Sequence, residues 1–276
     1  MENLHGSSAL VTGGSGGIGR HIAHALARQG ANVILAARRE DALRAVAEEL
    51  RGLGVQSEPL VVDLTDLEQA EQLVERAEAV FGTLDVLVHN AGIEIASSFP
   101  RYTRQELVTM ININLAAPLL MTHRALPGML QRGRGHVVFI SSLAGKHGTA
   151  YQEPYSATKA GLIGLTQSLR AEYTRSPVGF SVICPGFVAG EGMYQRMVEQ
   201  GLRSNRIMGS TTTERIAARV IDAIRRDVPE VIDSGSPVRP VLAISQVAPR
   251  LAERIMGRSG ATELFRRVAA SRGRAD

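Results

Sequence analysis

The stretch T-G-G-S-G-G-I-G, residues 12–19, decides the fold of this chain. It follows an apolar run at 8–12 and leads into a segment with helical periodicity at about 18–29. A glycine-rich turn between a strand and a helix lets the backbone approach a pyrophosphate, and the helix N-terminus behind it supplies free N–H groups. Gly13, Gly17 and Gly19 are spaced one residue wider than the usual dinucleotide fingerprint. A turn without a ligand is the alternative, and the strand–loop–helix context favours a dinucleotide site.

Short apolar runs alternate with helical patterns through most of the chain. The other runs are nearly continuously apolar, as expected for parallel strands covered on both faces, and they lie at 32–37, 58–64, 85–90, 136–141, 180–184 and 230–233. Amphipathic helices are predicted between them, at 39–53, 66–81, 103–131, 155–176 and 213–226. The last helix begins with a capping-box pattern from Thr211 to Glu214. Such repeated units predict an α/β fold with a doubly wound parallel sheet of about seven strands, a Rossmann fold.

A turn at 233–240 separates this body from a basic tail. We predict an NAD(P)-binding domain at 1–236, which includes the catalytic site, and a helical C-terminal extension at 237–276, with helices at about 240–256 and 261–270. Residues 239–276 contain eight arginines and three acidic residues, whereas the whole chain has a net charge of +4. The body is therefore nearly neutral, which argues against a nucleic-acid enzyme with a broad basic channel.

Composition also bears on location and on metal binding. No apolar run approaches the roughly 18 residues of a membrane span, and the first residues show no signal-peptide pattern. A single cysteine excludes an internal disulfide and a multi-cysteine metal site. We expect a cytoplasmic protein without a metal. The tail is apolar on one face and carries arginines on the other, so it either contacts a membrane surface or packs over the substrate pocket or a subunit interface; the second is favoured.

The end of the second strand bears on the cofactor. An NAD site usually places an acid there to bind the ribose hydroxyls. Here the sequence is Ala36-Ala37-Arg38-Arg39, which favours NADP, with NAD as the alternative. We expect Arg38 to contact a 2′-phosphate, and Arg39 to be a solvated residue at a helix start.

Two further strand ends suit a cofactor crevice. Small residues after the fourth strand, Asn90, Ala91 and Gly92, would let the backbone approach the cofactor, although the segment could be a plain turn. Asp63, after the third strand, could accept a hydrogen bond from an adenine amino group or cap the helix that begins near Asp66.

Tyr155 and Lys159 carry the chemistry that the pattern suggests. Residues four apart share one helix face, about 6 Å apart along the axis. A nearby ammonium favours tyrosinate, so we expect Lys159 to lower the phenol pKa and make Tyr155 a general acid or base. Ser142, at the end of the fifth predicted strand, would face the same crevice, with Ser141 as the competing candidate.

Taken together, these motifs resemble the short-chain dehydrogenase/reductase family. The resemblance covers about residues 7–235 and rests on Thr12 to Gly19, Asp63, N-A-G at 90–92, Asn114, Ser142, Tyr155 with Lys159, and P-G at 185–186. It implies an NAD(P)(H)-dependent oxidoreductase that interconverts a carbonyl and a secondary alcohol. A non-catalytic dinucleotide-binding regulatory or scaffold protein is the alternative, which has no need of the full serine, tyrosine, lysine and asparagine set.

The resemblance also implies roles for individual residues. Tyr155 would be the general acid or base, Ser142 would orient the substrate oxygen, and Lys159 would also hold the nicotinamide ribose. Asn114 would bind a water of the proton relay; kinking the long helix is its alternative role. Cofactor contacts are expected from Gly13, Ser15, Gly17, Ile18, Gly19, Arg38, Asp63, Leu64, Asn90, Ala91, Gly92, Tyr155, Lys159, Pro185, Gly186 and Val188.

Three positions depart from the family pattern. Gly190 stands where many relatives have a threonine that contacts the cofactor, and His89 replaces an asparagine, which we interpret as a structural change inside the sheet. Gly16 stands where many NADP-specific relatives carry a basic residue, so the NADP preference rests on Arg38.

The segment 188–209 corresponds to the family's substrate lid. Its Met193 and Tyr194 suggest an adaptable apolar wall, with plain packing as the alternative. We therefore expect a lipophilic ketone or alcohol as substrate. By the same resemblance we expect a homodimer or homotetramer built on the helices at about 103–131 and 155–176.

Overall fold

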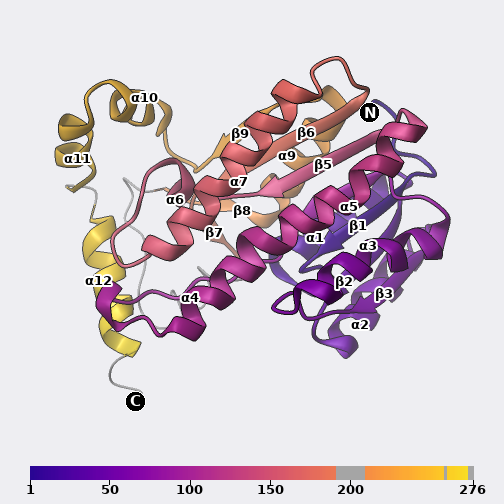
Figure 1. Cartoon of the computed structure of the whole chain (residues 1–276), viewed down its shortest axis with the longest axis horizontal. Coiled ribbons are helices and arrows are strands. Elements are labelled where there is room, and N and C mark those ends of the chain that lie inside the picture. The colour runs from indigo at the N-terminus through magenta and orange to yellow at the C-terminus, as the bar shows by residue number, and fades with distance from the viewer. Residues whose placement is uncertain (191–208, 258–259, 273–276) are drawn as a thin grey trace.

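A seven-stranded parallel sheet forms the centre of the computed structural model, which describes residues 1–190, 209–257 and 260–272 (Figure 1). The strand order is β3-β2-β1-β4-β5-β6-β9, with every neighbouring pair parallel. The strands are β1 Ser8–Thr12, β2 Asn32–Ala37, β3 Ser57–Val61, β4 Val86–His89, β5 Gly135–Ile140, β6 Val178–Pro185 and β9 Glu230–Asp233. The chain reverses its winding between β1 and β4, so the predicted doubly wound Rossmann fold is confirmed.

Helices cover both faces of the sheet and enclose two apolar cores. One core includes α1 (Gly17–Arg28), α2 (Glu40–Arg51) and α9 (Thr213–Arg226). The other includes α3 (Leu67–Phe81), α5 (Ala117–Arg132) and α7 (Glu153–Glu172). Alternate residues of each strand face opposite cores, as Val11 and Leu10 of β1 do, which explains why the strands are apolar throughout.

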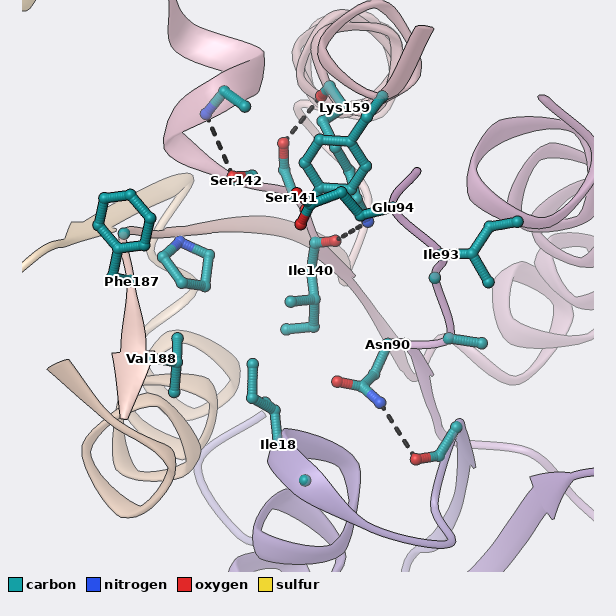
Figure 2. Close-up of a pocket in the computed structure, with 18 of the residues that line it drawn as sticks. Ile18, Asn90, Ile93, Glu94, Ile140, Ser141, Ser142, Lys159, Phe187 and Val188 are labelled. Atoms are coloured by element: carbon teal, nitrogen blue, oxygen red, sulfur yellow. Dashed lines mark hydrogen bonds between the residues drawn. The ribbon is translucent and has the colours of Figure 1, made fainter. Parts of the chain in front are cut away.

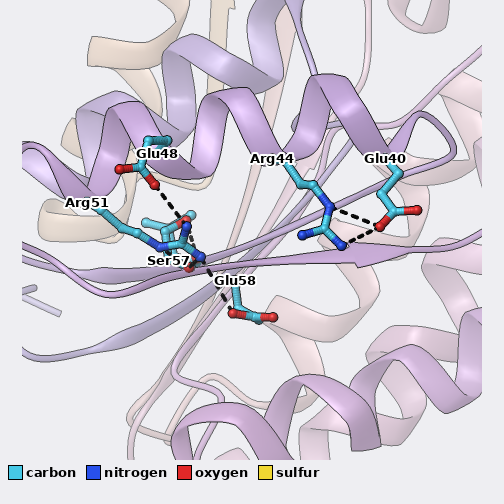
Figure 3. Close-up of polar contacts among 7 residues, drawn as sticks. Glu40, Arg44, Glu48, Arg51, Ser57 and Glu58 are labelled. Atoms are coloured by element: carbon cyan, nitrogen blue, oxygen red, sulfur yellow. Dashed lines mark hydrogen bonds and ion pairs between the residues drawn. The ribbon is translucent and has the colours of Figure 1, made fainter.

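The edge of the sheet at β3 is tied to α2 by an arginine at the helix end (Figure 3). Arg51 donates two hydrogen bonds to the Ser57 carbonyl, at 3.1 and 2.7 Å, and lies 3.1 Å from the Glu48 carboxylate and 3.7 Å from that of Glu58. These exposed ion pairs contribute little stability individually, but the arginine fixes the turn between α2 and β3. The end of α2 is thereby held against the sheet.

The predicted helix at 103–131 is present and continuous, with a π-helical turn inside it that the sequence did not predict. The structure has α4 (Arg104–Ile111), a π-helical turn η2 (Asn112–Ala116) and then α5. The π turn contains Asn114, whose side chain bonds to the backbone of Ile93 instead of facing outward. A tertiary contact therefore unwinds the helix locally, which is a common setting for π turns.

Helix α9 spans the predicted residues, but its cap differs from prediction. The cap of α9 is Thr212, which accepts a hydrogen bond from the Arg215 N–H at 3.3 Å, so the predicted capping residue, Thr211, is one residue early. Thr211 pairs instead with Val188 in a short second sheet, β7 (Val188–Ala189) with β8 (Thr211–Thr212). Strand pairing thus takes the residue that the pattern assigned to the cap.

The predicted tail helix at 240–256 is two helices, α10 (Arg239–Val247) and α11 (Pro249–Gly257), followed by α12 (Ala261–Arg272). The break falls at Ala248, which leaves the helical region with φ −137° and ψ 70°. The residue before a proline is disfavoured in α conformation, and Pro249 cannot donate a backbone hydrogen bond. In the part of the chain that the structure describes, no helix is both long and apolar enough to cross a membrane.

Candidate active site

A cavity of about 1530 Å³ lies at the carboxyl edge of the sheet, where β1, β2, β4, β5 and β6 end. It runs from the glycine-rich loop to the Ser142 and Tyr155 side chains (Figure 2). The predicted site residues that line it are Gly13, Ser15, Gly17, Ile18, Arg38, Asp63, Leu64, Asn90, Ala91, Gly92, Ser142, Tyr155, Lys159, Pro185, Gly186 and Val188. Gly19 and Asn114 lie behind the wall. Predicted substrate residues Met193 and Tyr194 lie outside the described residues.

The glycine loop is shaped for a close ligand. Gly13 and Gly17 have φ of +67° and +52°, in the left-handed region that favours glycine. A Cβ on Gly19 would lie 2.2 Å from the Gly13 carbonyl oxygen, so only glycine lets the helix start this close to the strand. Helix α1 then points its N-terminus toward the cavity, and its first residues, Gly17 and Ile18, line it. The loop therefore fits the pyrophosphate of a dinucleotide.

Thr12 joins the loop to the segment after β4. Its hydroxyl accepts hydrogen bonds from the N–H groups of Asn90 (3.0 Å) and Ala91 (3.1 Å) and donates to the Val88 carbonyl at 3.3 Å. The Asn90 amide returns hydrogen bonds to the carbonyls of Thr12 (2.9 Å) and Gly13 (3.3 Å). The two loops on either side of the β1–β4 crevice are thus one hydrogen-bonded unit.

The end of β2 presents two arginines to the cavity. Arg38 and Arg39 are both exposed and both line it. Arg39 also reaches over the glycine loop, because a Cβ on Gly16 would lie 3.9 Å from its guanidinium. Arg39 is exposed at the start of α2, as predicted, and its guanidinium lies near the position where Gly16 lacks a basic side chain.

Asp63 does not cap α3. That helix is capped by Asp66, whose carboxylate accepts from the N–H groups of Glu68 (3.0 Å) and Gln69 (3.2 Å). The Asp63 carboxylate accepts from the Thr65 N–H at 3.0 Å and lines the cavity. Of the two alternatives for Asp63, the helix cap is excluded.

Tyr155 lies in the first turn of α7, buried in the cavity wall, and Ser142 is near enough to lower the pKa of its phenol. The Ser142 hydroxyl accepts a hydrogen bond from the Ala144 N–H at 3.1 Å, which orients it at the end of β5. Ser141, the competing candidate, donates at 2.8 Å to the Lys159 carbonyl and so anchors α7.

The expected lowering of the Tyr155 pKa by Lys159 is wrong for this structure. Burial and the nearby Glu94 carboxylate raise the pKa of the phenol, and the Ser142 hydroxyl offsets this only in part. The Lys159 ammonium lies 5.7 Å from the centre of the Tyr155 ring and donates at 2.8 Å to the Ile140 carbonyl (Figure 2). Burial lowers the pKa of Lys159 to about 8, so its own charge is destabilised. The spacing of four residues correctly predicted that Tyr155 and Lys159 lie close together, but it did not predict that the Lys159 ammonium would bond to the Ile140 carbonyl.

Asn114 is fully buried and makes three hydrogen bonds. Its side chain accepts from the Ile93 N–H (2.9 Å) and donates to the Ile93 carbonyl (2.9 Å) and to Thr158 (3.2 Å). Asn114 and the Lys159 ammonium lie on the same side of Gly92, since a Cβ there would be 3.3 Å from each. Asn114 thus lies in the π turn and fixes the segment after Gly92.

Two departures from the family pattern have local causes. Buried His89 bonds to the Thr122 hydroxyl at 2.9 Å and stacks on Phe139 with ring centres 5.0 Å apart; burial lowers its pKa to about 3. It is a structural residue of the sheet, as predicted. Gly190 has φ +108°, which a threonine would adopt only with strain.

The sequence motifs missed two groups of cavity residues. Glu94 and Gln152 line the cavity near Tyr155, and their side chains are hydrogen-bonded to each other. A second part of the wall comes from α10, α12 and the turn before α10, and its residues are Gly235, Ser236, Pro237, Val238, Val241, Leu242, Ala261 and Phe265. No sequence motif includes Glu94. The wall from the tail could have been predicted from the apolar face of the tail helices.

Comparison with known proteins identifies the family. The family model described as short chain dehydrogenase matches residues 7–200. The chain belongs to this family. It is therefore an oxidoreductase that acts on CH–OH groups and binds a nicotinamide dinucleotide.

Curated relatives include several ketoacyl reductases. The chain is 35% identical over 277 residues to the ketoacyl reductase HetN of a Nostoc species, covering 99% of this chain and 96% of the relative. It is 36% identical over 186 residues to the 3-oxoacyl-[acyl-carrier-protein] reductase FabG of Escherichia coli, covering 67% of this chain and 75% of the relative.

Solved structures agree with this relationship. A 3-oxoacyl (acyl-carrier-protein) reductase from Agrobacterium tumefaciens with NADP bound matches with a TM-score of 0.77 and 29% identity, over 85% of this chain and 95% of the other. A metagenomic short-chain oxidoreductase in complex with NADP matches with a TM-score of 0.72 and 34% identity, over 83% and 97%.

Proposed function

We propose that this short chain dehydrogenase reduces lipophilic ketones to secondary alcohols with NADPH, with Tyr155 as the general acid. The observation that carries the proposal is that Tyr155 and Ser142 lie next to each other on the wall of a cavity that begins at the glycine loop. A bound nicotinamide would supply the hydride. Ser142 would hold the substrate oxygen, and the Tyr155 phenol would donate its proton to that oxygen.

A raised phenol pKa suits reduction. A tyrosine that keeps its proton over the physiological range is in the protonation state that reduction requires, whereas oxidation of an alcohol requires tyrosinate. Burial and Glu94 both keep the proton on Tyr155. We propose that Lys159 and Asn114, which lie beside Gly92, serve the ribose and the proton relay.

The side chains at the end of β2 and the start of α2 support NADPH over NADH. Arg38 and Arg39 both line the cavity at the end of β2. The nearest following acid, Glu40, is bound to Arg44 at 3.0 Å on the outer face of α2 (Figure 3) and does not line the cavity. A 2′-phosphate would thus meet two guanidinium groups and no carboxylate from this turn.

A lipophilic substrate is supported by the wall that the tail provides. Phe265 of α12 stacks on Phe187 with ring centres 6.1 Å apart, and both line the cavity together with Val241 and Leu242 of α10. We propose that residues 237–276 pack over the substrate end of the cavity and bind the apolar part of the ketone. This was the favoured alternative for the tail.

The proposal is tested by following NADPH absorbance with a series of methyl ketones of increasing chain length. We expect kcat/KM to rise with chain length in the wild type and to rise much less in Phe265→Ala. Val247→Ala is the matched control, because Val247 is 87% exposed on the same tail and does not line the cavity. Failure to reduce any ketone with either cofactor would overturn the proposed function.

By family resemblance we also propose a homodimer or homotetramer. Val108, Ile111 and Leu119 are large apolar side chains that are 41–46% exposed on α4 and α5, where the interface was predicted. Light scattering should give a mass of two or four chains, and Ile111→Asp should reduce it. A monomeric wild type would contradict this proposal.

A further inference from the structure

Glu94 places a carboxylate in the cavity on the side where Tyr155 lies. It follows Ile93 in the segment after β4, and it lines the cavity together with Ser142, Tyr155 and Lys159 (Figure 2). None of the motifs that identified the site includes it. A carboxylate in an otherwise mostly apolar cavity affects which substrates can bind there.

The backbone around Glu94 is fixed on both sides. Ile93 is held through both its N–H and its carbonyl by the buried Asn114 side chain, at 2.9 Å each. The carbonyl of Ile95 accepts a hydrogen bond at 2.7 Å from the Tyr102 hydroxyl, which is itself largely buried. Glu94 therefore projects from a rigid segment, and its position relative to the cavity is preorganised.

Its side chain is held as well. The Gln152 amide donates a hydrogen bond to the Glu94 carboxylate, and Gln152 is only 2% exposed. Gln152 precedes α7 and accepts the Ser156 N–H at 2.8 Å through its carbonyl, so it is part of the helix start that carries Tyr155. The carboxylate is thus tied to the same turn as the phenol.

We propose that Glu94, held by Gln152, is a specificity-determining residue that rejects carbonyl substrates with a negative charge near the reacting carbon. The substrate class is then the neutral derivatives of keto acids, such as esters, thioesters and amides, and not the free acids. Like charges brought together in a cavity repel each other, whereas an ester or an amide brings no charge. The inference rests on the proposed ketone reductase function.

The same geometry sets the direction of a pH effect. The Glu94 carboxylate opposes ionisation of the Tyr155 phenol, so its removal should move the alkaline rise of alcohol oxidation to lower pH. Lys159 from α7, His147 from the loop after α6 (Leu143–Lys146) and Cys184 of β6 are the other titratable groups around this end of the cavity. Glu94→Gln leaves all three in place, so a shift reports on the carboxylate.

The test compares ethyl acetoacetate with acetoacetate anion, which differ by one charge near the ketone. We expect the ratio of their kcat/KM values in the wild type to favour the ester strongly. Glu94→Gln keeps the size of the side chain and an acceptor for Gln152, and it should narrow the ratio about tenfold or more. Glu94→Asp keeps the charge and should retain most of the discrimination.

Two controls separate this inference from the proposed function. Glu153→Gln removes a neighbouring carboxylate that accepts from the Tyr151 N–H at 3.1 Å and does not line the cavity, so the ratio should stay unchanged. Calorimetric binding of both compounds to the enzyme loaded with NADP⁺ gives a measurement without turnover. If Glu94→Gln reduces the ester and its ratio of kcat/KM for ester over anion equals that of the wild type, the role of Glu94 is overturned and the proposed function stands. If the enzyme neither reduces nor binds either compound, both proposals are overturned.

Discussion

The Thr12 hydroxyl joins two loops of the cofactor crevice, and replacing it measures that junction. Thr12→Val keeps the shape of the side chain but removes the acceptor of the Asn90 and Ala91 N–H groups, at 3.0 and 3.1 Å. Thr12 is 1% exposed, so neither donor gains direct access to water at that point. Each buried donor without an acceptor costs about 1–3 kcal/mol, so for the two donors together we expect a loss of about 2–6 kcal/mol in the free energy of unfolding.

Thr12→Ser is the matched control. It keeps the hydroxyl and loses one methyl group, which costs about 1 kcal/mol. Urea unfolding followed by circular dichroism should place the Thr12→Val midpoint about 1 M below that of Thr12→Ser. Fluorescence titration should also show severalfold weaker NADPH binding in Thr12→Val, because Asn90 and Gly13 line the cavity. Equal midpoints for the two variants would refute the claim that this hydroxyl holds the two loops together.

Three further predictions address the site. Tyr155→Phe should lower kcat at least about a hundredfold and leave NADPH binding within about threefold by fluorescence titration; retained turnover would remove Tyr155 from the chemistry. Burial lowers the pKa of Lys159 to about 8, so between pH 8 and 10 the unfolded chain binds more protons at this residue than the folded chain. Without cofactor, the free energy of unfolding of the wild type should therefore rise by about 2 kcal/mol over this range relative to Lys159→Met. Chemical denaturation at each pH measures this difference, and a difference that does not change with pH would contradict the prediction. Arg38→Ala and Arg39→Ala should each weaken NADPH binding at least about tenfold and NADH binding much less; equal losses for both cofactors would exclude phosphate contacts.

Features encoded locally were predictable from the sequence. Continuous apolar runs located all seven strands of the main sheet to within a few residues, because parallel strands are buried on both faces. The strand ends then placed Gly13, Asn90 and Ser142 at one edge, since parallel strands point the same way. Because the parallel strands end at the same edge of the sheet, residues that follow them lie close together, and the motif residues therefore line one cavity.

Features that depend on distant contacts were not predictable. The π turn at Asn114 forms because its side chain bonds to Ile93, 21 residues earlier in the chain. Lys159 turns its ammonium to the Ile140 carbonyl, which helical spacing does not reveal. The break at Ala248 is different, because Pro249 was visible in the sequence and predicts a boundary by itself.

The cavity wall formed by the C-terminal extension lies in a different part of the chain from the reacting groups and the cofactor loops. The family model ends at residue 200, and the match to the Escherichia coli reductase covers 67% of this chain, whereas the match to the Nostoc reductase covers 99%. The reacting groups and the cofactor loops lie in the part that these relatives share. Phe265 and its neighbours on the cavity wall do not lie within the family model. Under the proposed role of the tail, changes in the last forty or so residues would alter the substrate range and leave the reacting groups unchanged, and exchanging tails between relatives would be a route to new chain-length selectivity.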